Sequence, residues 1–104
     1  MDPIELAQAQ REDARWRILN LLNKTRPTAT SEAIIHRHLA HDLELPYGPH
    51  AVRKELTYLR DKGLVEIPDT DVSTWIARLT VDGVDVVEYA IDCPAGIARP
   101  RKFY

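Results

Sequence analysis

Apolar residues recur at steps of three and four along four stretches of the chain, which is the spacing of helices that bury one face. The predicted helices span residues 3–23, 32–43, 49–62 and 81–91. Pro3 and Pro49 stand at first helical positions, where proline is favoured, and Gly63 ends the third helix. The pattern therefore indicates a mostly helical protein.

Two short strands separated by a polar turn follow the third helix at once. The strands are Leu64–Ile67 and Thr74–Leu79, with Pro68–Ser73 between them. Trp75 alternates onto the apolar face of the second strand, so we expect it in the core. The largely polar stretch 28–31 is predicted to be a connector. The order helix, helix, helix, two-stranded wing, helix is α+β and typical of a winged helix-turn-helix domain.

Two segments carry local signatures of such domains. The run LTYLRDKGLVEI at Leu56–Ile67 resembles the junction of recognition helix and wing, and LTVDGVDVVEYA at Leu79–Ala90 resembles the next helix of MarR-, PadR- and ArsR-like regulators. A closer resemblance, over about 11–100, is to small winged-helix proteins of Mu-like phages and prophages, and it includes the ending Gly96–Pro100. The resemblance implies a phage-type transcriptional regulator that places helix 49–62 in the major groove of double-stranded DNA.

The polar face of the third helix carries the residues best suited to contact DNA. They are His50, Arg53, Lys54, Thr57 and Tyr58. Arginine can pair with guanine, and lysine and threonine reach phosphates or base edges, although an ordinary solvated helix face is an equally open interpretation. The wing turn holds Asp69 and Asp71 and no cation, so we expect phosphate to repel it and the wing not to insert.

The net charge of −2 is unevenly distributed along the chain. We divide the chain into a winged-helix domain at 1–91 and a basic C-terminal tail at 92–104, in which Arg99, Arg101 and Lys102 are candidates for phosphate or partner contacts. A frayed, solvated terminus is the slightly favoured alternative for the tail. Because the rest of the chain is acidic, a winged-helix adaptor that binds proteins and no DNA stays open as a second hypothesis.

Three apolar residues of the first helix lie off its buried stripe: Ile4, Leu6 and Trp16. We expect them to form an exposed patch that meets a second copy or a partner. Many winged-helix regulators dimerise through their terminal helices, so the resemblance implies a homodimer through the first and fourth helices. The arginines of the first helix are Arg11, Arg15 and Arg17, and we expect them to be solvated because neighbouring carboxylates offset their charge.

The chain carries no motif for catalysis, so we predict a non-enzyme without a cofactor or small-molecule substrate. The histidines His36, His38 and His41 lack the spacing of a metal site, so none is predicted. Cys93 follows an acidic residue near a helix end, and we expect it to be inert. No apolar run approaches the ~20 residues that cross a bilayer, and the N-terminus has no export signal, which favours a cytoplasmic protein.

Overall fold

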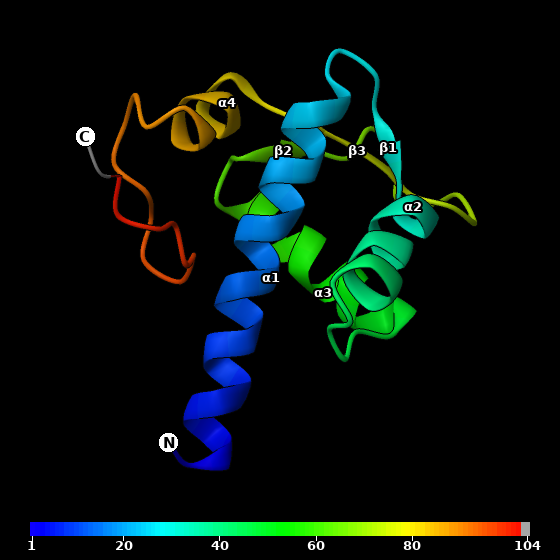
Figure 1. Cartoon of the computed structure of the whole chain (residues 1–104). Coiled ribbons are helices and arrows are strands. Elements are labelled where there is room, and N and C mark those ends of the chain that lie inside the picture. Colours follow the sequence, from blue (N-terminus) through cyan, green and yellow to red (C-terminus); the bar gives the residue numbers. More distant parts are fainter. Residues whose placement is uncertain (103–104) are drawn as a thin grey trace.

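The long helix α1, Pro3–Thr25, crosses the molecule, and the other elements pack along its C-terminal half (Figure 1). This computed structural model describes residues 1–102. α1 begins as predicted, because the Asp2 carboxylate accepts a hydrogen bond from the N–H of Glu5 at 2.8 Å. Its N-terminal turns project beyond the body of the molecule (Figure 1).

The second predicted helix consists of two pieces. Helix α2, Glu32–Arg37, is capped by the Ser31 side chain and continues into a π-helix, η1, His38–Asp42. The predicted third helix is confirmed as α3, Pro49–Asp61. The structure therefore has two helical segments, α2 with η1 and then α3, joined by a short turn, with α2 packed on α3.

A small antiparallel sheet holds three short strands over the described residues. They are β1, Thr30–Ser31, β2, Val65–Glu66, and β3, Ile76–Leu79, in the order β1-β3-β2. The predicted connector at 28–31 was correct for residues 28–29 and wrong for β1, because Thr30 is buried and pairs with Ala77 of β3. Such a two-residue strand exists only through its distant partner.

The last helix is shorter than predicted. α4, Val81–Val87, is capped by the Thr80 hydroxyl, which accepts a hydrogen bond from Gly83 at 3.0 Å. Its predicted end at 91 was wrong, because Tyr89 adopts a φ of 61°, which a right-handed helix does not allow.

The core lies where α1, α2, α3 and α4 meet the sheet. Its largest fully buried side chains are Ile18, Leu19, Leu22, Ile35, Leu39, Val52, Leu56, Leu59 and Val86. Trp75 was predicted to lie in this core, but it is only partly buried at the edge. The fold is α+β and mostly helical, as predicted. None of the helices within residues 1–102 is long and apolar enough to span a membrane.

Candidate nucleic-acid interface

Helix α3 has one buried face and one open face. Val52, Leu56 and Leu59 lie in the core, as their spacing predicted. His50 and Lys54 lie on the opposite face and are exposed, and neither side chain forms a hydrogen bond or ion pair within the described range 1–102. These two side chains are therefore open to an external ligand.

Arg53 lies beside that open face, but its partly exposed guanidinium is engaged by other residues of the protein. Its Nε and Nη2 donate to the two carboxylate oxygens of Glu32 at 2.8 and 2.9 Å. Nη2 also donates to the Ser73 carbonyl at 2.9 Å, and the group lies over the Trp75 ring at 4.5 Å. The hydrogen bond from Arg53, opposed by partial burial, lowers the pKa of Glu32, and the same bond raises the pKa of Arg53.

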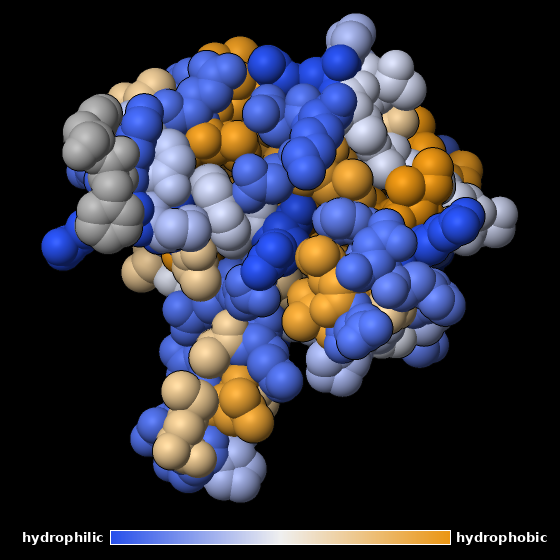
Figure 2. All heavy atoms as spheres, in the orientation of Figure 1, coloured by the Kyte–Doolittle hydropathy of each residue, from blue (hydrophilic) through white to orange (hydrophobic). Residues whose placement is uncertain are grey.

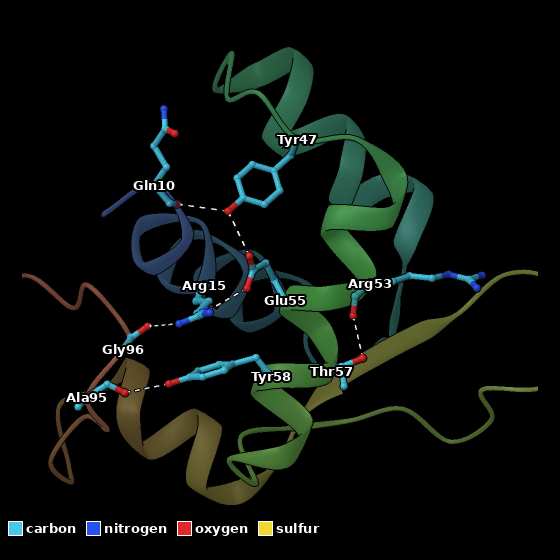
Figure 3. Close-up of polar contacts among 9 residues, drawn as sticks. All are labelled: Gln10, Arg15, Tyr47, Arg53, Glu55, Thr57, Tyr58, Ala95 and Gly96. Carbon is cyan, nitrogen blue, oxygen red and sulfur yellow. Dashed lines mark hydrogen bonds and ion pairs between the residues drawn. The ribbon is translucent and has the colours of Figure 1, made fainter. Parts of the chain in front are cut away.

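Thr57 and Tyr58 also have partners within the protein (Figure 3). The Thr57 hydroxyl donates to the Arg53 carbonyl at 2.8 Å, one turn back along α3. The Tyr58 hydroxyl donates to the Ala95 carbonyl at 2.9 Å, and the Arg15 guanidinium stacks on the Tyr58 ring at 3.6 Å. Of the five predicted residues, the structure leaves His50 and Lys54 the most accessible.

A buried polar network joins α1 to the other side of α3 (Figure 3). Glu55 is only 4% exposed and pairs with Arg15 at 2.9 Å. The Tyr47 hydroxyl donates to Glu55 at 3.2 Å, and burial, together with the Glu55 charge, raises the pKa of Tyr47 to about 12. The prediction that Arg15 is solvated was wrong. One sequence signal pointed to this network, since Glu55 lies beside the apolar stripe of α3 rather than opposite it.

The tail packs back onto the domain over the residues 92–102 that the structure describes. The Arg15 Nη1 donates to the Gly96 carbonyl at 2.8 Å, and Ile97 is buried against the core. A frayed terminus was therefore the wrong expectation for this part of the tail. The final residues of the predicted tail, 103–104, lie outside the described residues.

The basic residues of the tail differ in their surroundings. Arg99 donates from Nη1 to the Val86 carbonyl at 3.0 Å and lies over the Tyr89 ring at 4.5 Å. Lys102 lies over the same ring at 5.4 Å, and Arg101 is exposed. Arg99 therefore helps to end α4, while Arg101 faces solvent.

The predicted apolar patch on α1 is divided. Ile4 and Leu6 are 78% and 49% exposed on the projecting end of the helix, which carries apolar side chains in Figure 2. Trp16 follows about 15 Å further along the helix, at 1.5 Å per residue, and packs edge-on against Tyr89 with ring centroids 6.1 Å apart. Thus Ile4 and Leu6 are both exposed at the projecting end of α1, whereas Trp16 packs on Tyr89 elsewhere.

The turn between β2 and β3 is exposed and acidic. Asp69 accepts a hydrogen bond from the N–H of Asp71 at 2.8 Å, and Trp75 Nε1 donates to the Thr70 carbonyl at 3.1 Å. Residues 68–74 contain no lysine or arginine. The expectation that this turn stays out of a DNA groove stands as a prediction.

The histidines and the cysteine occupy separate places. The His36 and His41 rings are 6.4 Å apart, and His38 contacts Asp42 at 3.3 Å. Within residues 1–102, no three His, Cys, Asp or Glu side chains are close enough to hold a metal ion. Burial raises the pKa of the half-buried Cys93 thiol, which disfavours the reactive thiolate.

The chain was also compared with known proteins. No protein-family model and no curated protein matches it. Among solved structures, it is similar to H. salinarum RosR, in a structure described as grown from NaBr. The two are 27% identical with a TM-score of 0.64, and the match covers 74% of this chain and 67% of the RosR chain. The two proteins therefore share a fold over the matched part.

Proposed function

We propose that this protein is a winged helix-turn-helix DNA-binding regulator that presents α3 to the major groove. The order and packing of the elements support the proposal, because α2 packs on α3 and a two-stranded hairpin follows α3 directly. The hairpin β2–β3 then corresponds to the wing. The match to RosR supports the fold on which this assignment depends.

One observation carries the functional part of the proposal. The outer face of α3 carries His50 and Lys54, and no described residue covers or neutralises them. A helix with an open face of polar and basic side chains is what major-groove contact requires. Thr57 lies on the same face and Arg101 on the tail, and both join the proposed contacts as secondary groups.

We further propose a phage-type transcriptional regulator that acts in the cytoplasm without catalysis. The support is the sequence resemblance at Val52–Val65 and Gly96–Pro100 to the winged-helix proteins of Mu-like phages. A homodimer would present two copies of α3 to successive major grooves. The exposed Ile4 and Leu6 at the projecting end of α1 are the proposed dimer contact.

The experiment that tests the proposal is binding to a mixed pool of duplex DNA fragments at two salt concentrations. We expect affinity to fall steeply with salt, because each neutralised phosphate releases counterions. Lys54→Ala should lower the affinity for all fragments and reduce the slope of log K against log salt by about one. Lys24→Ala is the matched control, since it removes the same charge from an exposed site on α1.

A second function is favoured by two specific observations. Arg53 and Tyr58 are engaged within the protein, so fewer of the predicted side chains are available to DNA than the sequence indicated. The net charge of −2 also opposes binding to a polyanion. Absence of DNA binding at low salt would favour a protein-interaction adaptor. In that case, Ile4→Asp should abolish capture of the partner protein, whereas Lys54→Ala should not.

A further inference from the structure

Arg53 joins three parts of the structure that lie far apart in the sequence. It belongs to α3, while Glu32 is the first residue of α2, and Ser73 and Trp75 belong to the segment between the strands β2 and β3. We call these four residues the Arg53 cluster. Figure 3 shows the Arg53 side chain extending away from Glu55, on the other side of α3. The cluster is thus separate from the network that links α3 to α1.

The hydrogen bonds within the protein leave few N–H donors of the Arg53 guanidinium free to pair with a DNA base. Of its five N–H groups, the Nε–H and one Nη2–H are directed at Glu32, and the other Nη2–H is directed at the Ser73 carbonyl. The ring of Trp75 covers one face of the group. Bidentate pairing with guanine needs two adjacent donors, and every pair of adjacent nitrogens here includes an engaged one.

Glu32 also forms hydrogen bonds with Trp75 at the base of the hairpin. Its carboxylate accepts a hydrogen bond from the N–H of Trp75 at 3.2 Å, and its own N–H donates to the Trp75 carbonyl at 2.8 Å. Arg53, Glu32 and Trp75 therefore form a closed set of contacts. Since β2 contains only two residues, its pairing with β3 by itself does little to hold the hairpin in one position.

We propose that Arg53 is a positioning residue, which holds the wing and the start of α2 against α3 and so sets the approach of α3 to DNA. This inference rests on the proposed DNA-binding function. It changes the role of a residue that the sequence indicated as a DNA contact. Arg53 acts through the position of α3 and the wing, and His50 and Lys54 make the contacts.

The sign of one substitution separates the two roles of Arg53. If Arg53 positions the wing, Glu32→Ala weakens DNA binding, because the wing loses its attachment. If Arg53 reads bases, the same substitution releases its guanidinium and strengthens binding. Arg53→Ala and Arg53→Lys should both weaken binding, since lysine lacks the planar fork and the stacking surface of arginine.

The experiment measures two properties of each full-length variant. The first is amide hydrogen exchange of residues 69–76 without DNA, and the second is affinity for the DNA pool. For Glu32→Ala and Arg53→Ala we expect exchange to rise about tenfold, as befits the loss of charged hydrogen bonds, and affinity to fall. Glu66→Ala is the control, because it removes an exposed ion pair, Glu66 with Arg78 at 3.5 Å, from the same hairpin.

The outcomes distinguish this inference from the proposed function. Unchanged exchange in both variants, or stronger DNA binding by Glu32→Ala, would overturn the positioning role. If the natural chain binds no DNA, the proposed function fails, and the inference about DNA approach fails with it, while the exchange data still decide whether Arg53 holds the hairpin. If Glu32→Ala does not fold, Glu32→Gln keeps the side-chain shape and gives the same test with the same expected signs.

Discussion

Removing the positive charge of Arg15 should destabilise this protein far more than removing that of a neighbouring arginine. The Arg15 and Glu55 side chains are 13% and 5% exposed, and their ion pair is 2.9 Å long. Arg15→Met keeps most of the apolar stem and removes the guanidinium. Glu55 would then be a buried carboxylate whose only remaining side-chain donor, among the described residues, is the Tyr47 hydroxyl.

The expected loss follows from the burial of the pair. Removing one partner of a buried ion pair costs about 3–5 kcal/mol, because the other charge stays buried without compensation. That is a large part of the ~5–15 kcal/mol by which folded domains are stable. Replacing both partners, with Arg15→Met and Glu55→Leu, removes the uncompensated charge, so the double variant should be more stable than Arg15→Met alone.

The assay is urea unfolding at neutral pH, followed by far-UV circular dichroism. Arg17→Met is the control on the same helix, because its ion pair with Asp13 is 3.3 Å long and its side chain is 48% exposed. Its cost should stay within about 1 kcal/mol. If Arg15→Met costs no more than this control, or if the losses of the two single variants simply add in the double variant, the reasoning is refuted.

Three further predictions concern the tail, the Arg53 cluster and the cysteine. Gly96→Ala should cost at least ~1–2 kcal/mol in urea unfolding, because Gly96 has a φ of 93° and a Cβ there would collide with the Tyr58 hydroxyl, whereas Gly48→Ala, in open space, should cost less. The folded state lowers the pKa of Glu32, so the ionised carboxylate should contribute its full stabilisation of the fold above the ordinary value of 4.5, and this stabilisation should be lost as pH falls through the lowered value. The free energy of unfolding, measured against pH, should therefore decrease over this range, and Glu32→Gln should remove the decrease. Cys93 should react with a thiol reagent at neutral pH more slowly in the folded protein than in urea, since burial raises its pKa, and equal rates would contradict this.

The starts of the helices could be predicted from the sequence because helix caps are local. Asp2, Ser31, Gly48 and Thr80 precede the α-helices of residues 1–102 as N-caps, and these helices begin at the predicted residues 3, 32, 49 and 81. The end of α4 could not be predicted in this way. The Val86 carbonyl near its C-terminus accepts a hydrogen bond from Arg99, whose position depends on how the tail folds back.

The same division holds for the candidate site. Helical periodicity by itself placed His50 and Lys54 opposite the buried stripe of α3, and the structure leaves both exposed. Periodicity also placed Arg53 and Tyr58 near that face, but it carries no information on what lies beside a helix. Their partners, Glu32 and Ala95, are 21 and 37 residues away in the chain.

The sequence by itself thus determined which segments are helical, which side of each helix is apolar and which chemical groups the chain can offer. These properties depend on neighbours within one or two helical turns. Only the tertiary structure decided which charged side chains stay available to an external ligand. Arg15 and Arg53 satisfy their hydrogen bonds with Glu55 and Glu32, because packing brings those carboxylates within 3 Å of groups that would otherwise face solvent.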